Sequence, residues 1–344
     1  MAKIIPTAGF AFVEFATPDP VALVNTWSQM GFVAVARHKN LPVTLYRQGQ
    51  IYFVLNQIPS GHAAEFARAH GPAAAGAGFY CTDPAATLAA AQQSDLTIKP
   101  AQLPWLSQKL DALVGIGGSL IYLCPTGADL FAADFVFDAA VPSPGIGLQQ
   151  IDHLSFNVLR GDLEYWAGIM QAVFGFREIR YFNIHGKKTA LRSRALLSAC
   201  ETMRITINES MDEQSQIAEF INTYKGAGIQ HIALAPQDIY ATVEAMHKSG
   251  LPFVPVPGAY YDAIKERYPD SGEDIERMRR NYILLDGANE KREILLQIVT
   301  TPIVGPLFFE VIQRKGCDGF GEGNFTALFE ALERDQIARG VLAA

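Results

Sequence analysis

Residues 9–32 read GFAFVEFATPDPVALVNTWSQMGF, and residues 151–176 read IDHLSFNVLRGDLEYWAGIMQAVFGF. Each stretch starts with apolar residues typical of a strand, passes through a polar turn and continues into an amphipathic helix that ends at Gly-Phe. Residues 76–92 and 231–247 form a second pair of this kind, each with an Asp in the turn. The pattern predicts an internal duplication.

One strand-helix-strand-strand-strand unit cannot bury the inner face of its sheet alone, so such units pair around a cleft. We predict an α+β fold in which duplicated βαβββ modules form two open half-barrel domains. The segment AAVPSPGIGLQQ at residues 139–150 is rich in Pro and Gly, which favours a linker. The expected domains are residues 1–145 and 146–344.

The composition excludes several classes of protein. Among 344 residues, 28 basic and 35 acidic side chains are interspersed and give a net charge of −7, so no basic surface is available for nucleic acid or a membrane. The sequence contains no apolar run long enough for a membrane span and no secretory pattern at MAKIIPTAGF. We expect a cytoplasmic protein whose four separated cysteines are reduced.

Three residues in short apolar segments name a chemistry: His153, His231 and Glu310. Side chains alternate between the faces of a strand, which places both histidines on the smaller or more polar face. Glu310 lies within LFFEVIQ, where an unpaired charge is costly, so it needs a cation. Two imidazoles and one carboxylate are the ligands of the facial triad, which leaves positions open for substrate and dioxygen.

The alternative for each residue alone is a hydrogen-bonded histidine, or a Glu310 paired with Arg314. The spacings of 78 and 79 residues, which put each ligand on its own strand of one module, favour a joint site. The ligand set suits iron(II), with manganese, nickel or zinc left open. Aligning Asp83 with Asp238 puts Gly76 opposite His231, so the N-terminal half should hold no metal.

Beyond Glu310 the chain continues as IQRKGCDGFGEGNF. Together with GIQHIAL around His231, INES at 207–210, LLQI at 295–298 and FFEVIQRKG, this segment resembles the 4-hydroxyphenylpyruvate dioxygenases of the vicinal-oxygen-chelate superfamily. The match spans the C-terminal half and is looser in the N-terminal half. Some bacterial members have been described as haemolysins or pigment-forming factors, but no pore-forming activity is expected from that name.

The resemblance implies that His153, His231 and Glu310 bind Fe(II), and that 4-hydroxyphenylpyruvate chelates it through its own 2-keto acid. With O2 as the second substrate, the products would be homogentisate and CO2. Related bacterial enzymes are dimers or tetramers, so a homodimer or homotetramer is expected. The resemblance also implies a C-terminal helix that closes over the iron as a lid, after a glycine-rich hinge.

The same resemblance supplies a set of pocket residues. Three amides, Asn208, Gln230 and Gln297, are expected to take part in catalysis. The substrate-binding set is Ser193, Thr206, Asn208, Gln216, Gln230, Gln297, Phe308, Phe320, Gly321, Asn324, Phe325 and Phe329. Without the motif match, the phenylalanines would be interpreted as ordinary core and Asn208 as a turn residue at the end of a strand. Asn324 is also expected to cap the C-terminal helix.

Two positions depart from the family pattern. Thr206 stands where most members have proline, and a threonine there is also a feature of hydroxymandelate synthase, which uses the same substrate and iron. Val299 replaces a more usual phenylalanine. Asn208, Phe325 and Phe329 keep the dioxygenase identity, which favours homogentisate. The remaining alternatives are the synthase, a small-molecule-binding protein without catalysis, and a purely structural oligomer.

Overall fold

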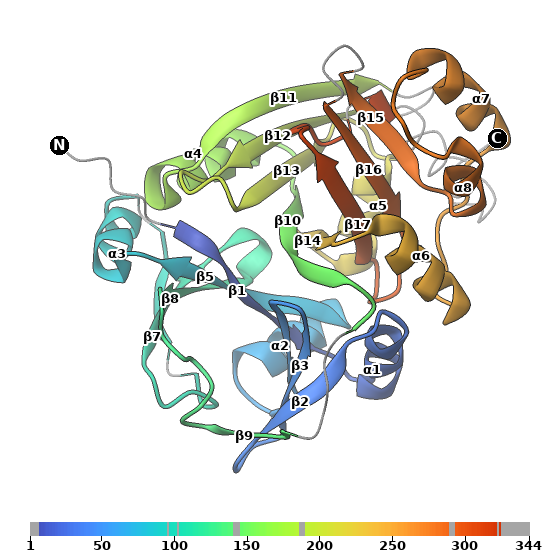
Figure 1. Ribbon diagram of the computed structural model, residues 1–344. Coiled ribbons are helices and arrows are strands. Elements are labelled where there is room, and N and C mark those ends of the chain that lie inside the picture. The colour runs from blue at the N-terminus through green and yellow to red at the C-terminus, as the bar shows by residue number, and fades with distance from the viewer. Residues whose placement is uncertain are drawn as a thin grey trace.

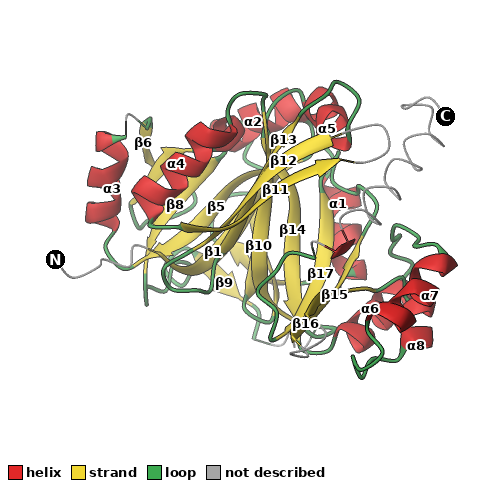
Figure 2. Cartoon of the chain, turned by 90° about the horizontal axis from the view of Figure 1, so that it is seen from above, coloured by secondary structure: helices red, strands yellow, loops and turns green. Residues whose placement is uncertain are grey.

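The computed structural model describes residues 7–94, 96–101, 103–139, 145–185, 190–288, 293–321 and 323–324. The chain forms two curved sheets, one from each half of the sequence, with the N-terminal sheet below the C-terminal sheet in Figure 1. Figure 2 shows the same arrangement from above, with helices lying around the strands. None of the helices in these segments is long and apolar enough to cross a membrane.

The first sheet has nine strands in the described residues, in the order β6-β7-β8-β5-β1-β4-β3-β2-β9. Its elements along the chain are β1 (Thr7–Ala16), α1 (Pro20–Gln29), β2 (Val33–His38), β3 (Val43–Gln48), β4 (Ile51–Asn56), α2 (His62–His70), β5 (Ala73–Cys81), α3 (Pro84–Gln93), β6 (Ile98–Ala101), β7 (Leu110–Val114), β8 (Leu120–Pro125) and β9 (Phe135–Phe137). A short 3-10 helix, Ile116–Gly118, joins β7 to β8.

The second sheet has eight described strands in the order β11-β12-β13-β10-β14-β17-β16-β15. Its elements are β10 (Leu148–Val158), α4 (Leu163–Phe174), β11 (Arg177–His185), β12 (Ala190–Leu197), β13 (Arg204–Ser210), α5 (Gln216–Tyr224), β14 (Gly228–Pro236), α6 (Ile239–Lys248), α7 (Gly258–Arg267), α8 (Ile275–Arg280), β15 (Leu284–Ala288), β16 (Glu293–Val299) and β17 (Phe308–Lys315).

The two sheets share one topology. Among the described strands, β6-β7-β8-β5-β1-β4-β3-β2 correspond one to one with β15-β16-β17-β14-β10-β13-β12-β11, and only β9 is additional. The parallel pairs β1 with β4 and β5 with β8 have parallel counterparts in β10 with β13 and β14 with β17. The predicted α+β fold of duplicated βαβββ modules is therefore confirmed.

Capping residues fix the helix starts at matching places in the two halves. The Asp83 carboxylate accepts a hydrogen bond from the Ala86 N–H at the start of α3. The Asp238 carboxylate accepts from the N–H groups of Tyr240 and Ala241 at the start of α6. Each Asp satisfies donors that the first helical turn leaves free, which is why an Asp recurs at this point of the repeat.

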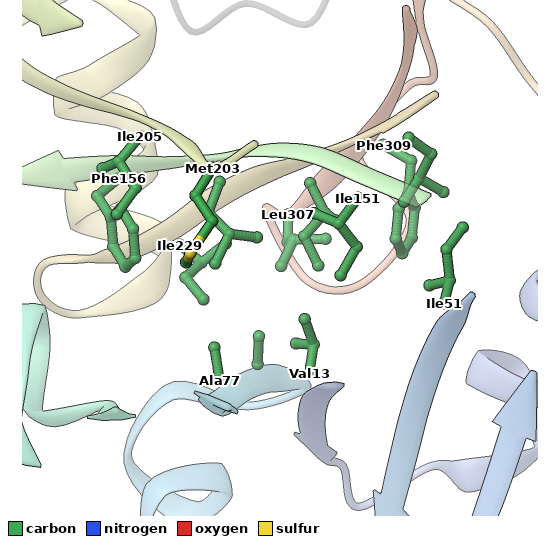
Figure 3. Packing of buried hydrophobic residues seen from close by; sticks show 14 of the residues in the cluster. Val13, Ile51, Ala77, Ile151, Phe156, Met203, Ile205, Ile229, Leu307 and Phe309 are labelled. Atoms are coloured by element: carbon green, nitrogen blue, oxygen red, sulfur yellow. The ribbon is translucent and has the colours of Figure 1, made fainter. Parts of the chain in front are cut away.

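An apolar core joins the two sheets. Val13 and Ala77 of the first sheet and Ile151, Phe156 and Phe309 of the second belong to one buried cluster (Figure 3). The rings of Phe53 and Phe309 meet across the sheets with centroids 5.9 Å apart. Because side chains alternate along a strand, burying Leu154 and Phe156 in this core turns His153 and Ser155 to the other face of the second sheet.

The corresponding face of the first sheet is filled. Phe12 lies opposite Gly78 in the first sheet, just as His153 lies opposite Ala233 in the second. Tyr122 also lies opposite Gly78, as Glu310 lies opposite Ala233. Phe12 stacks on Tyr122 with centroids 5.5 Å apart. The buried Glu14 carboxylate accepts hydrogen bonds from Asn56 (2.7 Å), the Trp105 indole (3.1 Å) and the Tyr122 hydroxyl (2.5 Å).

Two expectations are not tested by the described residues. The division into residues 1–145 and 146–344 stays a prediction, and residues 140–144 beside it lie outside the described segments. The lid helix, with Phe325 and Phe329, also lies outside them. All four cysteines are described, with Cys81 and Cys124 buried and Cys200 and Cys317 half-buried.

Candidate metal centre

Three neighbouring strands bring His153, His231 and Glu310 together. His153 lies on β10 opposite Ala233 of β14, and Glu310 of β17 lies opposite the same Ala233. His231 stands two residues before Ala233, so it points to the same face. The small side chain of Ala233 leaves the space between His153 and Glu310 open.

One polar atom of each of the three side chains points to a common position. His153 Nε2 lies 3.2 Å from His231 Nε2 and 3.4 Å from Glu310 Oε2, and His231 Nε2 lies 3.3 Å from the same oxygen. Ligand atoms about 2.1 Å from one ion lie about 3.0 Å apart when their bonds meet at right angles, and slightly farther apart at wider angles. The triangle therefore fits a single divalent cation bound on one face.

Electrostatics supports a ligand set of one ionised carboxylate. Burial raises the pKa of Glu310, but the contacts with His153 and His231 outweigh it and lower the pKa to about 2. Burial also lowers the pKa of both imidazoles. For His153 the carboxylates of Asp152 and Glu310 reverse this effect and raise its pKa, whereas the pKa of His231 stays lowered. A buried, ionised carboxylate between two imidazoles favours a cation.

Each imidazole is held from behind by the residue that precedes it. His153 Nδ1 lies 2.8 Å from Asp152 Oδ1, and His231 Nδ1 lies 3.1 Å from Gln230 Oε1. A carboxylate or carbonyl oxygen accepts, so a neutral imidazole carries its proton on Nδ1 and keeps the Nε2 lone pair for a metal. Gln230, expected as a pocket residue, thus also contacts a candidate ligand.

Arg314 does not pair with Glu310. Its guanidinium makes two contacts with the Asp152 carboxylate, at 2.8 and 2.9 Å. The alternative of a Glu310–Arg314 pair is therefore wrong. The sequence contains no signal for Asp152, because a residue next to His153 in a regular strand would point to the opposite face.

Polar side chains continue the same face beyond His153. The Ser155 hydroxyl accepts hydrogen bonds from the Thr206 hydroxyl (2.7 Å) and the Asn208 amide (2.8 Å). Asn208 also donates to the Asn157 carbonyl oxygen at 3.3 Å, and Ser193 lies opposite Asn208 in the register of β12 and β13. The resemblance grouped Ser193, Thr206 and Asn208, and the structure places them next to one another. Ser155 and Asn157 belong to the same polar group.

Aromatic rings border the triad on two sides. The Phe308 ring stacks on His231 with centroids 4.8 Å apart, and the Phe320 and His153 rings make a T-shaped contact with centroids 5.3 Å apart. A cavity of about 450 Å³ reaches this region and is lined by Gln216, Gln230 and Phe308 among others. Its volume is in the range of small-molecule sites.

Gln297 lies on β16 and is 2% exposed. Its Oε1 has no hydrogen-bond partner in the segments that the structure describes, so an acceptor is available to a ligand. Gly321 has a φ of +78° and lies so close that a Cβ there would overlap the Gln297 amide. Asn324 is buried, and its side-chain oxygen accepts from the Tyr260 hydroxyl at 2.6 Å.

Known proteins match both halves of the chain. Residues 3–136 match the family described as Hydroxyphenylpyruvate dioxygenase, HPPD, N-terminal. Residues 150–267 match the Glyoxalase/Bleomycin resistance protein/Dioxygenase superfamily.

Relatives and a solved structure match nearly the full length. Hemolysin VllY of Vibrio vulnificus is 46% identical over 345 residues, covering 98% of this chain and 97% of that protein. The 4-hydroxyphenylpyruvate dioxygenase of Legionella pneumophila is 46% identical over 336 residues, covering 97% and 96%. A mutant of 4-hydroxymandelate synthase from Streptomyces coelicolor superimposes with a TM-score of 0.82 at 26% identity, covering 96% of this chain and 100% of that chain. The chain therefore belongs to the 4-hydroxyphenylpyruvate dioxygenase family.

Proposed function

We propose that the chain is an Fe(II)-dependent dioxygenase that converts 4-hydroxyphenylpyruvate and O2 to homogentisate and CO2. The observation that carries this proposal is the convergence of His153 Nε2, His231 Nε2 and Glu310 Oε2 within 3.4 Å of one another on one buried face. The relative of this name in Legionella pneumophila supports the choice of substrate.

One group of residues would bind the metal, and another group would bind the organic substrate. His153, His231 and Glu310 would hold the ion on one side and leave its opposite side to ligands. Fe(II), when bound, supplies chelation of the 2-keto acid and activation of O2. The surrounding buried strands exclude bulk water from this side of the site.

Amide side chains would orient the substrate. We assign this role to Asn208, Gln230 and Gln297, because their polar atoms lie on the face that carries the triad. Gln297 Oε1, which has no hydrogen-bond partner among the described residues, can accept a hydrogen bond from a substrate hydroxyl. Phe308, stacked on His231, offers an apolar surface for the aromatic ring.

Product identification tests the proposal. Metal-free protein is loaded with Fe(II) under anaerobic conditions, mixed with 4-hydroxyphenylpyruvate and exposed to O2. Homogentisate, identified by mass and retention time, is the expected product, and Glu310→Ala should form none while remaining folded. Retained activity of this variant would remove Glu310 from the metal centre.

The competing reaction is that of a 4-hydroxymandelate synthase. Two observations favour it: the superposition with that enzyme and the presence of Thr206 beside the site, where its hydroxyl donates to Ser155. Hydroxymandelate as the main product of the same experiment would decide for the synthase. A chain that takes up no Fe(II) would instead favour a binding protein without catalysis.

A further inference from the structure

Asp152 leaves the regular pattern of its strand. Ile151 of β10 lies opposite Leu234, and His153 lies opposite the next residue along β14, Ala233, so Asp152 is an extra residue in β10. Such a β-bulge redirects a side chain. Without it, Asp152 would point to the face of Leu154, which is apolar core, where an unpaired carboxylate is costly. The bulge brings the carboxylate to the face of His153.

Asp152 then determines which nitrogen of His153 can serve a metal. Its Oδ1 lies 2.8 Å from His153 Nδ1, and Asp152 is 4% exposed, so water does not compete for this contact. A carboxylate accepts, which keeps the proton of a neutral imidazole on Nδ1. The Nε2 lone pair then faces His231 Nε2 and Glu310 Oε2, the position where a cation fits.

Arg314 holds Asp152 in place. It lies on β17 four residues after Glu310 and contacts both Asp152 oxygens through Nε (2.8 Å) and Nη2 (2.9 Å). This two-point contact fixes the orientation of the carboxylate and balances its charge without a proton. A second cation, Arg204, lies farther away at 3.9 Å and pairs with Asp318 at 2.8 Å.

Arg314 also reaches the loop that leads toward the C-terminal segment. Its Nη1 donates to the carbonyl oxygens of Cys317 (3.2 Å) and Gly319. Its guanidinium lies 5.3 Å from the centre of the Phe320 ring, which makes a T-shaped contact with the His153 ring. The loop and the imidazole are therefore held by the same side chain.

We infer that Asp152 and Arg314 are positioning residues of the metal centre, with Asp152 orienting His153 and Arg314 acting through Asp152. Behind His231 lies the uncharged Gln230 amide, whereas a carboxylate lies behind His153, so the two histidines are supported unequally. Loss of a partner behind a metal-binding histidine typically weakens metal affinity about 10- to 100-fold. This inference rests on the proposed metal centre but not on the identity of the product.

The test is metal affinity of the full chain in the absence of substrate. Metal-free wild type and Asp152→Asn are titrated with Co(II) by calorimetry and by the visible spectrum, at one pH, and with Fe(II) under anaerobic conditions. We expect Asp152→Asn to bind about 10- to 100-fold more weakly. We also expect its Co(II) spectrum to differ from that of wild type, which loss of stability alone would not produce.

Glu14→Gln is the matched control. Glu14 is also a buried carboxylate with several donors, but it lies in the first sheet, where Phe12 and Tyr122 occupy the positions of ligands. Its variant should lose stability and keep the metal affinity of wild type. An equal loss of affinity in Glu14→Gln and Asp152→Asn would overturn the inference, because it would mean a general effect of damaged packing.

Arg314 is tested by coupling. If Arg314 acts through Asp152, the double variant Asp152→Asn/Arg314→Gln binds metal as weakly as Asp152→Asn and no more weakly. If the loss of affinity in the double variant equals the product of the losses in the two single variants, Arg314 does not act through Asp152. If Asp152→Asn does not fold, Arg314→Lys decides, because it keeps the charge and loses the two-point contact. We expect at least a threefold weaker affinity, and an unchanged affinity overturns the inference.

The wild-type titration separates this inference from the proposed function. Wild type that binds neither Co(II) nor Fe(II) would refute the metal centre and the dioxygenase proposal with it. Wild type that binds metal, together with Asp152→Asn of equal affinity and an unchanged Co(II) spectrum, would refute only the role of Asp152 and Arg314.

Discussion

Replacing Glu310 by Gln should change how the stability of the metal-free protein depends on pH. The ordinary pKa of 4.5 falls to about 2 in the folded chain because His153 and His231 contact the carboxylate, which is 6% exposed. This difference, at about 1.4 kcal/mol for each pKa unit, corresponds to about 3 kcal/mol at neutral pH. The contact also helps to raise the pKa of His153, so it is counted once, on the carboxylate.

The sign follows from the direction of the change. A lowered pKa means that the ionised carboxylate stabilises the fold above pH 4.5 and that this contribution disappears as pH falls toward about 2. Wild type should therefore exceed Glu310→Gln by about 3 kcal/mol at pH 7 and by roughly half of that at pH 3. Urea unfolding of both proteins in the presence of a chelator, at several pH values between 7 and 3, measures the difference.

A difference that stays constant from pH 7 to pH 3 would refute this reasoning, because it would show that the charge of Glu310 does not contribute. The control is Glu266→Gln on α7, whose side chain is exposed. Its stability should follow that of wild type within about 0.5 kcal/mol throughout, as is usual for surface positions.

Three further outcomes are expected. Phe309→Ala should lower the free energy of unfolding, measured in urea, by about 3 to 5 kcal/mol, because Phe309 is fully buried between the sheets. The control Phe137→Ala, at a side chain that is 43% exposed, should lower it far less. Equal losses of stability would contradict the packing. Gly321→Ala should raise KM in steady-state kinetics, because the added methyl group crowds the Gln297 amide. Gly127 also has a positive φ but has open space around it, so Gly127→Ala should leave KM unchanged. Equal KM values for the two variants would exclude crowding. Adding Fe(II) at about 100 times Kd to chelator-treated protein should stabilise it by about 2.7 kcal/mol in calorimetry, and an unchanged Tm would count against a metal centre.

Much of the fold was predictable from local pattern. The alternation in residues 151–158 and the Asp turns at 83 and 238 identified the strands, the helix starts and the duplication, because these signals depend on nearest neighbours in the chain. The order of strands within each sheet was not predictable in this way. It depends on pairings such as β14 with β17, whose partners are far apart in sequence.

Part of the candidate site was also predictable from local pattern, and part was not. His153, His231 and Glu310 were selected from residue type and predicted face, and the structure brings these three together. The alternative to a metal site, in which Glu310 pairs with Arg314, is wrong, since the guanidinium contacts Asp152. Phe325 and Phe329 lie outside the described residues, and their pocket role stays a prediction.

The sequence by itself determined the ligand types, the duplicated modules and the family resemblance, because these are properties of residue identity and short-range order. Only the tertiary structure decided what supports the ligands. Asp152 of β10 and Gln230 of β14 are extra residues in the pairing of these strands, and each side chain turns to the Nδ1 of the histidine that follows it. Strand alternation alone predicts the opposite face for both. Each bulge is a local irregularity in the pairing of β10 with β14, which are far apart in sequence, so local pattern does not reveal it.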